Sequence, residues 1–247
     1  MNKQEVSEIK KLVADKKDDL NYSNINSTLG IKRYIKMADQ IKAVMGNGKI
    51  LDWGCGLGQM SYLLKKRGLE VVSLDISSTK HPLLEEAGQA KVVPSNSVEL
   101  PFPPASFDAV LSSGVLEHVD DPQGSLKEIT RILKNQGYFF IYMLPNKYSY
   151  IEFISDLLRR GAHPIKYSVG GIKKTLKQLN FEVLTAGYQN FLPYNLKGFP
   201  SICRKIYLKL SGAIATLDLI FTHVPLLNKL STNIIIIAKK ESEEQGR

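Results

Sequence analysis

The chain contains few cysteines and has no long apolar stretch. Its 247 residues include only Cys55 and Cys203, which lack the partner spacing of a zinc site or a disulfide framework. The segment from Met1 to Glu5 has no apolar core of the kind found in signal peptides. No run approaches the ~20 predominantly apolar residues that span a bilayer. We therefore expect a cytoplasmic protein without a metal site.

Acidic residues are fewer than basic ones, and the formal net charge is +9. Such a charge raises the possibility of nucleic-acid binding, because clustered Lys and Arg attract phosphates. The basic residues are dispersed, however, and no recognisable RNA- or DNA-binding module accompanies them. The short basic groups are 10–11, 16–17, 65–67, 173–174 and 239–240. We interpret most of them as solvated faces and expect no nucleic-acid partner.

A glycine-rich turn follows the first short apolar run. The segment from Lys49 to Trp53 has the composition of a buried strand, and Gly54, Gly56 and Gly58 follow at alternate positions. Glycines at this spacing let the backbone turn tightly and approach a ligand where a Cβ atom would block it. The pattern predicts a site for a nucleoside-type cofactor.

A carboxylate ends the next apolar segment. Asp75 follows the expected strand 70–74, which places it where it can accept hydrogen bonds from two ribose hydroxyls. A nicotinamide or flavin dinucleotide is the obvious rival, but its G-x-G-x-x-G fingerprint requires a third glycine. Counting from Gly54 puts Gln59 at that position, and counting from Gly56 puts Ser61 there. The spacing favours a methyl-donor site.

Four blocks of sequence resemble one known family. The run Asp52-Trp53-Gly54-Cys55-Gly56-Leu57-Gly58 resembles the D-x-G-C-G-x-G motif of class I S-adenosylmethionine-dependent methyltransferases. Segments 100–103 (LPFP), 106–110 (SFDAV) and 116–119 (LEHV) are similar to later blocks of that family, in the same order. The similarity extends over about 49–144, and more loosely to Ala238. A single motif would be weak evidence, whereas four in the right order are strong.

The resemblance implies S-adenosyl-L-methionine as the cofactor. Asp52 would orient its aminoacyl end through the glycine turn, Asp75 would bind the ribose, and Ile76 would cover the adenine. The family commonly has an acidic residue against the adenine amino group; here that position is Asn96, whose carbonyl can accept the same hydrogen bond without charge. The expected cofactor-binding residues are Asp52, Gly54, Cys55, Gly56, Asp75, Ile76, Asn96, Ser97 and Ser113. Cys55 fits the turn as a small residue and is not expected to be a nucleophile.

Strands and helices are expected to alternate in an α/β, doubly wound sheet. Strands are predicted at 49–53, 70–74, 92–93, 107–112, 138–144, 181–188 and 233–238. Helices are predicted after the glycine turn, from Pro122 to a turn at 135–137, and over 151–160 and 171–179. The resemblance implies a Rossmann-like seven-stranded sheet of order 3-2-1-4-5-7-6, with the last strand antiparallel and helices on both faces.

The chain divides into an N-terminal helical segment (1–46), a methyltransferase domain (47–240) and a polar tail (241–247). The first segment is expected to fold over the cofactor site. A helical insertion at about 190–230 pairs Lys197, Arg204, Lys205 and Lys209 with apolar residues and then continues into an apolar stretch. Such helices suit a membrane surface, where they would give peripheral contact at the inner face, or a cap on the substrate pocket. Both interpretations stay open, as does the oligomeric state.

Catalysis of methyl transfer depends mainly on aligning the nucleophile with the methyl carbon and excluding water. A base is needed when the acceptor is a weakly acidic hydroxyl, and His118 is the best candidate. Hydrogen bonding within its loop is the competing role, and His163 is a second candidate. We expect O-methylation of a small-molecule or lipid-linked acceptor. The alternatives are a non-catalytic subunit that binds the cofactor and, less favoured, a nucleic-acid methyltransferase.

Overall fold

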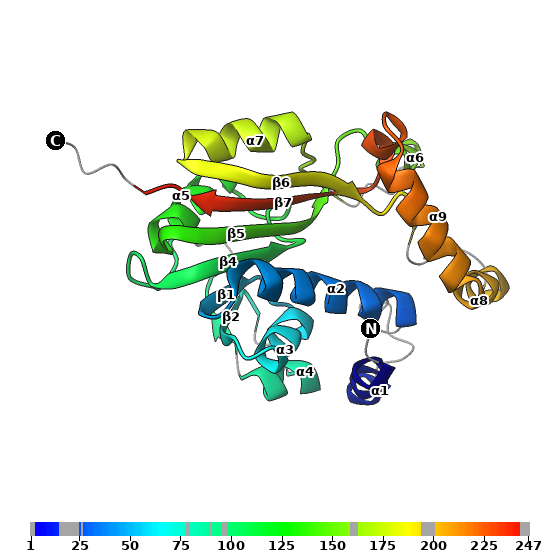
Figure 1. The fold of residues 1–247 in the computed structure, drawn as a ribbon, viewed down its shortest axis with the longest axis horizontal. Coiled ribbons are helices and arrows are strands. Elements are labelled where there is room, and N and C mark those ends of the chain that lie inside the picture. The colour runs from blue at the N-terminus through cyan, green and yellow to red at the C-terminus, as the bar shows by residue number, and fades with distance from the viewer. Residues whose placement is uncertain are drawn as a thin grey trace.

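The computed structural model describes residues 3–14, 25, 27–77, 80–88, 90–94, 98–158, 163–193 and 201–242. Its centre is a seven-stranded sheet of order β3-β2-β1-β4-β5-β7-β6. The first five strands are parallel, and β7 is antiparallel to both of its neighbours, β5 and β6. The strands are β1 (Lys49–Trp53), β2 (Glu70–Asp75), β3 (Lys91–Val92), β4 (Phe107–Ser113), β5 (Leu133–Pro145), β6 (Phe181–Gln189) and β7 (Asn233–Lys240). The predicted fold and strand order are confirmed (Figure 1).

Helices cover both faces of this sheet (Figure 1). One apolar core joins the N-terminal helices and those after β1 and β2 to the sheet, and a second lies under α5 and α7. The helices of these layers are α1 (Lys3–Leu12), α2 (Thr28–Met45), α3 (Gln59–Lys66), α4 (Pro82–Ala87), α5 (Pro122–Ile132) and α7 (Val169–Gln178). Central strands are apolar on both sides because both faces are covered. In β7, residues 234–237 are four consecutive buried isoleucines.

Local signals in the sequence set several element ends. Asp121 accepts a hydrogen bond from Gly124 N–H at 2.9 Å and caps α5, with Pro122 in its first turn. Gly68 takes a positive φ of 75° just past the end of α3. The predicted start of the helix at Pro122 is confirmed.

Two element boundaries were predicted incorrectly. The expected turn at 135–137 is an irregularity within β5, where Gln136 takes a positive φ of 62° and the register with β4 shifts. The chain therefore bends while strand pairing resumes on the far side of the bulge. The helix expected over 151–160 is α6 (Tyr150–Leu157), and 159–160 lie outside the described residues.

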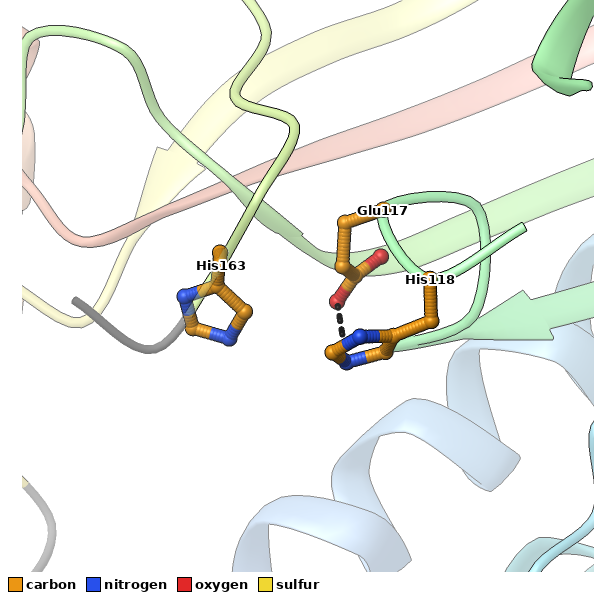
Figure 2. A group of neighbouring side chains, drawn as sticks. All are labelled: Glu117, His118 and His163. Carbon is orange, nitrogen blue, oxygen red and sulfur yellow. Dashed lines mark ion pairs between the residues drawn. The ribbon is translucent and has the colours of Figure 1, made fainter. Parts of the chain in front are cut away.

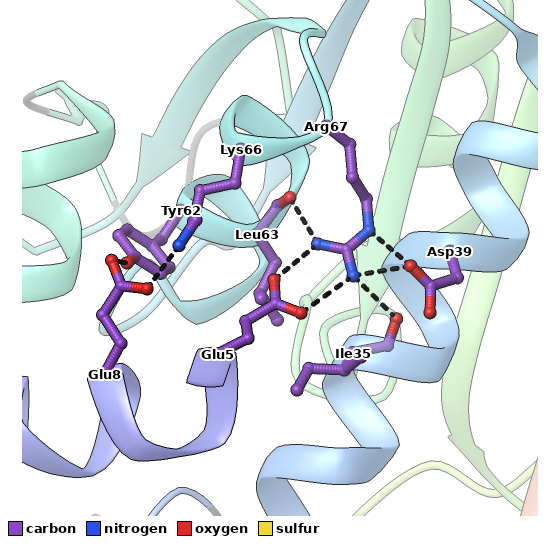
Figure 3. A network of polar contacts seen from close by, with 8 residues as sticks. All are labelled: Glu5, Glu8, Ile35, Asp39, Tyr62, Leu63, Lys66 and Arg67. Atoms are coloured by element: carbon purple, nitrogen blue, oxygen red, sulfur yellow. Dashed lines mark hydrogen bonds and ion pairs between the residues drawn. The ribbon is translucent and has the colours of Figure 1, made fainter. Parts of the chain in front are cut away.

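A polar network attaches α1 to the helices beneath it (Figure 3). The Arg67 guanidinium pairs with Glu5 at 3.0 Å and with Asp39 at 2.6 Å. Tyr62 donates to Glu8 at 2.6 Å, and Lys66 pairs with the same carboxylate. The network therefore links α1 to α3 and, through Asp39, to α2. The N-terminal segment thus packs against the helix that follows the glycine turn.

A separate group of helices lies at one end of the sheet. Figure 1 shows α6, α8 (Ser201–Lys209) and α9 (Ser211–His223) beyond the carboxyl ends of the parallel strands, with η3 (Leu227–Leu230) leading back into β7. Asp218 of α9 accepts a hydrogen bond from Leu192 N–H at 2.7 Å. The Phe191 ring contacts those of Tyr150 and Phe221 and so joins α6 to α9. Among the described residues, no helix is long and apolar enough to cross a membrane.

Candidate active site

The glycine turn connects β1 to α3 at the carboxyl end of the sheet. The N–H groups of Gly54 and Cys55 both donate to the carbonyl of Leu74, at 2.8 and 3.0 Å, and so fasten the turn to β2. Gly54, Gly56 and Gly58 have φ values of 69°, 54° and 81°. This left-handed conformation is costly for residues with a Cβ atom, which explains the alternating glycines.

The three glycines differ in what surrounds them. A Cβ atom at Gly54 would lie 2.5 Å from Val115, and one at Gly58 would lie 2.7 Å from the Leu84 backbone. A Cβ atom at Gly56 would meet no protein atom within 4 Å. Close packing therefore explains two of the glycines, whereas Gly56 faces open space. That space fits a ligand that contacts the backbone of the turn.

Asp75 lies beside this space at the end of β2. One oxygen accepts a hydrogen bond from Gly56 N–H at 2.7 Å, and the other accepts from the Ser77 backbone at 3.1 Å. The Ser77 hydroxyl also donates to this second oxygen, at 3.2 Å. The carboxylate is thereby oriented on the turn, and the oxygen bonded to Gly56 keeps a second lone pair for a ligand. Ile76, the next residue, exposes its apolar side chain. Both positions suit the ribose and adenine contacts that the resemblance implies.

Asp52 is buried beneath the turn. Its carboxylate accepts a hydrogen bond from the Ser61 hydroxyl at 2.6 Å, and Ser73 donates to Ser61 at 2.8 Å. Burial raises the pKa of Asp52 to about 6, although the hydrogen bonds from Ser61 oppose the shift. Since its side chain does not reach the surface, Asp52 can influence a ligand only through the glycine turn and the first turn of α3.

The other predicted cofactor residues have different surroundings. Cys55 is buried, and burial together with the charges of Asp52 and Asp75 raises the pKa of its thiol, which makes it a poor nucleophile. The Ser113 hydroxyl, at the end of β4, is buried and has no hydrogen-bond partner in the structure. An orphaned hydroxyl at this edge of the sheet fits a bound polar ligand. Asn96 and Ser97 lie outside the described residues.

A second cluster combines residues from two loops. Glu117, His118 and His163 each bring a side-chain nitrogen or oxygen within 4.8 Å of the others (Figure 2). Glu117 is buried, one of its oxygens has no hydrogen-bond partner in the structure, and burial raises its pKa to about 7. The His118 side chain is 53% exposed, and its Nε2 lies 4.0 Å from Glu117. One carboxylate and two imidazoles at this separation suit proton transfer or a bound cation, and no metal site had been predicted here.

His163 has the stronger support within this cluster. Its Nδ1 lies 2.9 Å from the carboxylate of Glu152, a buried residue of α6. That hydrogen bond raises the pKa of His163, burial opposes the shift, and the charge of Glu117 adds to it. Lys166 lies 3.5 Å from the other Glu152 oxygen. The structure therefore brings both predicted histidines together, but attaches only His163 to a carboxylate by a hydrogen bond.

Glu117 and Glu152 were missed as functional candidates. Glu117 adjoins His118 in the block 116–119 (LEHV), and this position was the signal that could have revealed it. Glu152 stands in the first turn of α6, where acidic residues are common because they complement the helix dipole. Its burial against a distant histidine depends on tertiary structure alone.

Comparison with known proteins identifies the fold. A family model described as a methyltransferase domain matches residues 51–141, which include the glycine turn, Asp75 and the Glu117–His118 pair. This domain belongs to the class I S-adenosylmethionine-dependent methyltransferases. The predicted family is confirmed, and the cofactor of the family is S-adenosyl-L-methionine. Glu152 and His163 lie beyond the matched segment of this methyltransferase domain.

Individual relatives of the methyltransferase domain support the same family and fold. The chain is 31% identical over 141 residues to the ubiquinone biosynthesis O-methyltransferase of Nitrosomonas europaea, with 51% of this chain and 59% of the relative covered. It thus spans about three fifths of that relative's length. A SAM-dependent methyltransferase of Thermotoga maritima, titled a possible histamine N-methyltransferase, has a TM-score of 0.59 at 16% identity and covers 95% of this chain and 99% of its own.

A further solved structure holds ligands. The 1,6-didemethyltoxoflavin-N1-methyltransferase of Burkholderia thailandensis has a TM-score of 0.57 at 16% identity over 96% of this chain and 87% of its own. That structure contains 1,6-didemethyltoxoflavin and S-adenosylhomocysteine. At such low identity the likeness supports the methyltransferase fold and carries no information on the acceptor.

Proposed function

We propose that the chain transfers a methyl group from S-adenosyl-L-methionine to a hydroxyl group of a small-molecule or lipid-linked acceptor. The observation that carries this proposal is the open space over Gly56, bordered by the oriented carboxylate of Asp75. Glu117 and His118 follow the carboxyl end of β4, His163 joins them from the segment between α6 and α7, and the cluster supplies proton-accepting groups. Ligands of open α/β sheets bind beyond the carboxyl ends of the strands, where both features lie.

The residues of the turn would hold the cofactor by complementary charge and shape. Asp75 would accept hydrogen bonds from the ribose hydroxyls, and Ile76 would cover the adenine. The N–H groups at the start of α3 would face the carboxylate of the cofactor. Asn96 and Ser97 keep their predicted adenine contacts as part of this proposal. When bound, the cofactor supplies an electrophilic methyl group on a sulfonium. The chain then contributes alignment, exclusion of water and removal of the acceptor proton.

Substitution of Asp75 tests cofactor binding. We expect Asp75→Ala to weaken binding of S-adenosylmethionine by roughly 1.5–3 kcal/mol, because two ribose hydroxyls lose a charged acceptor. Glu70→Ala, at the opposite end of the same strand, is the control and should bind normally. Calorimetric titration measures all three proteins. Absence of binding by the native protein, or equal affinity in Asp75→Ala, contradicts the proposed site.

An apolar surface near the site favours a lipid-linked or otherwise apolar acceptor. The helices at this end of the molecule expose large apolar side chains, and Leu157 is 72% exposed. Monomeric proteins rarely expose such residues in contiguous groups without a binding role. The exposed apolar residues of α6, α8 and α9 are Phe153, Ile154, Leu157, Ile202, Ile206, Leu217, Leu219 and Ile220. We refer to them as the apolar end.

Positive charge accompanies the apolar end. Lys205 and Lys209 of α8 are exposed on the same helix as Ile202 and Ile206. Apolar residues beside cations suit an anionic membrane surface, where each Lys or Arg near the lipid contributes about 1 kcal/mol. Of the other predicted contacts, Lys197 and the Arg204 side chain lie outside the described residues. Peripheral attachment of this kind needs no spanning helix.

Neutralising α8 tests the membrane contact. We expect Lys205→Gln with Lys209→Gln to lose about 2 kcal/mol of binding, roughly 30-fold, to vesicles of equal parts phosphatidylglycerol and phosphatidylcholine at low salt. The same change at Lys173 and Lys174 of α7 is the control for net charge. Co-sedimentation at low and high salt provides the measurement. Equal sedimentation of the native and α8 proteins, or none by either, would reduce the apolar end to a lid on the pocket.

A further inference from the structure

His163 and Glu152 form a hydrogen-bonded pair with the geometry of an oriented base. Glu152 lies in the first turn of α6, and His163 follows in the segment leading to α7. The Glu152 backbone N–H donates to the hydroxyl of Ser149, which caps the helix. The backbone from which the Glu152 carboxylate extends is therefore held in place. The contact of this carboxylate with His163 Nδ1 then fixes the plane of the imidazole ring.

The hydrogen bond also selects the tautomer of His163. A carboxylate with a lowered pKa is an acceptor, so in the neutral ring Nδ1 carries the hydrogen that it donates to Glu152. The lone pair of the neutral ring is then on Nε2. Figure 2 shows His163 with a ring nitrogen directed toward Glu117 and His118, and the two imidazole centroids lie 5.8 Å apart. Nε2 is therefore the basic atom, and it lies on the side of the ring that faces Glu117 and His118.

We propose that His163 Nε2 is the general base that removes the acceptor proton, and that Glu152 is its positioning residue. The inference rests on the proposed methyl transfer to a hydroxyl. The acceptor O–H bond breaks and its proton moves to Nε2, while an oxygen electron pair forms the bond to the methyl carbon. The electron pair of the broken carbon–sulfur bond stays on sulfur as a neutral thioether, and the imidazolium later releases its proton to water.

His118 is less suited to this role. It is more exposed, its contact with Glu117 is 4.0 Å long, and burial and the charge of His163 lower its pKa. For His163, the bond to Glu152 and the charge of Glu117 raise the pKa, while burial and Lys166 oppose them. A base with a raised pKa removes a hydroxyl proton with a larger driving force. Its active, unprotonated form accumulates as the pH rises through that pKa.

Nuclear magnetic resonance tests the pair without requiring turnover. In protein with ¹⁵N-labelled histidine and bound S-adenosylhomocysteine, we expect His163 to show the Nδ1–H tautomer at alkaline pH and a pKa above that of His118. Glu152→Gln should lower the His163 pKa toward its ordinary value. Glu182→Gln, the same change at an exposed position of β6, should leave it unaltered. An Nε2–H tautomer in the native protein, or no response to Glu152→Gln, overturns the pair.

Kinetics with 4-hexylcatechol as the probe acceptor tests the catalytic role. His163→Ala should lose on the order of 10²–10⁴-fold in kcat, whereas His118→Ala should lose less. Glu152→Gln should move the inflection of the rate against pH to lower pH, and Glu152→Asp should partly restore the native profile. A larger loss in His118→Ala than in His163→Ala overturns the assignment. Loss of activity in EDTA that Mg²⁺ restores also overturns it, because the cluster would then serve a metal ion.

Failure of this inference differs from failure of the proposed function. If the native protein does not bind S-adenosylmethionine, methyl transfer itself is wrong. If the native protein binds and methylates the probe, but His163→Ala binds equally and turns over at the native rate, only the base is wrong. Calorimetric titration of both proteins separates these outcomes, since neither His163 nor Glu152 belongs to the cofactor turn.

Discussion

Replacing Gly56 by alanine is expected to abolish S-adenosylmethionine binding at concentrations that saturate the native protein, a loss of at least about 100-fold. The new Cβ atom meets no protein atom within 4 Å, so it enters the space assigned to the cofactor. The positive φ of 54° at residue 56 adds strain of roughly 1–2 kcal/mol to the folded state once the residue carries a Cβ atom. The fold should tolerate this cost, because native proteins have stabilities of about 5–15 kcal/mol.

Gly68→Ala is the matched control for backbone strain. Gly68 has a φ of 75° and open surroundings like those of Gly56, but it lies at the other end of α3. The two variants should therefore lose similar free energy of unfolding in urea, while only Gly56→Ala loses cofactor affinity in calorimetry. Native affinity in Gly56→Ala would show that the space over the turn is not the cofactor site.

The cofactor half of the site was predictable because its signals are local. A turn with glycines at alternate positions and a carboxylate at the next strand end are both properties of short segments. Gly54, Gly56 and Asp75 therefore lie together as predicted, and the hydrogen bond from Gly56 to Asp75 joins the two strand ends directly. The sheet order followed from the family resemblance, since alternating elements alone do not determine the order of strands.

The acceptor half of the site was predictable only in part because its contacts are not local. His118 and His163 were each proposed separately, but no pattern in the chain places the two side chains next to each other. The carboxylate that distinguishes them, Glu152, is eleven residues from His163 and belongs to a helix with an amphipathic sequence. The bulge in β5 was missed for a related reason. An Asn-Gln-Gly sequence favours a turn, but pairing with β4 on both sides keeps the segment in the sheet.

The buried carboxylate of Asp52 predicts an unusual dependence of stability on pH. Its pKa is raised from 3.8 to about 6 in the folded chain, chiefly by burial. The folded state therefore holds this proton more tightly than the unfolded state. The associated stability is complete below about pH 3.8 and is lost as the pH rises through about 6. Near neutral pH the loss is on the order of 3 kcal/mol, at 1.36 kcal/mol per pKa unit.

Asp52→Asn removes this titration and tests its size. We expect the free energy of unfolding of the variant, minus that of the native protein, to increase by about 2.5 kcal/mol between pH 4 and pH 7.5, measured in urea. The pH dependence is diagnostic because a change in packing around the amide alters the free energy of unfolding by the same amount at both pH values. Asp108→Asn is a control of opposite sign. Burial opposes the ionisation of Asp108, but Lys134 and the Lys49 N–H lower its pKa below 3.8, so this variant should lose stability relative to the native protein as the pH rises toward 3.8 and should change little between pH 4 and pH 7.5. A difference for Asp52→Asn that is independent of pH would show that its carboxyl titrates normally in the folded chain, and that Ser61 and Ser73 fully compensate its burial.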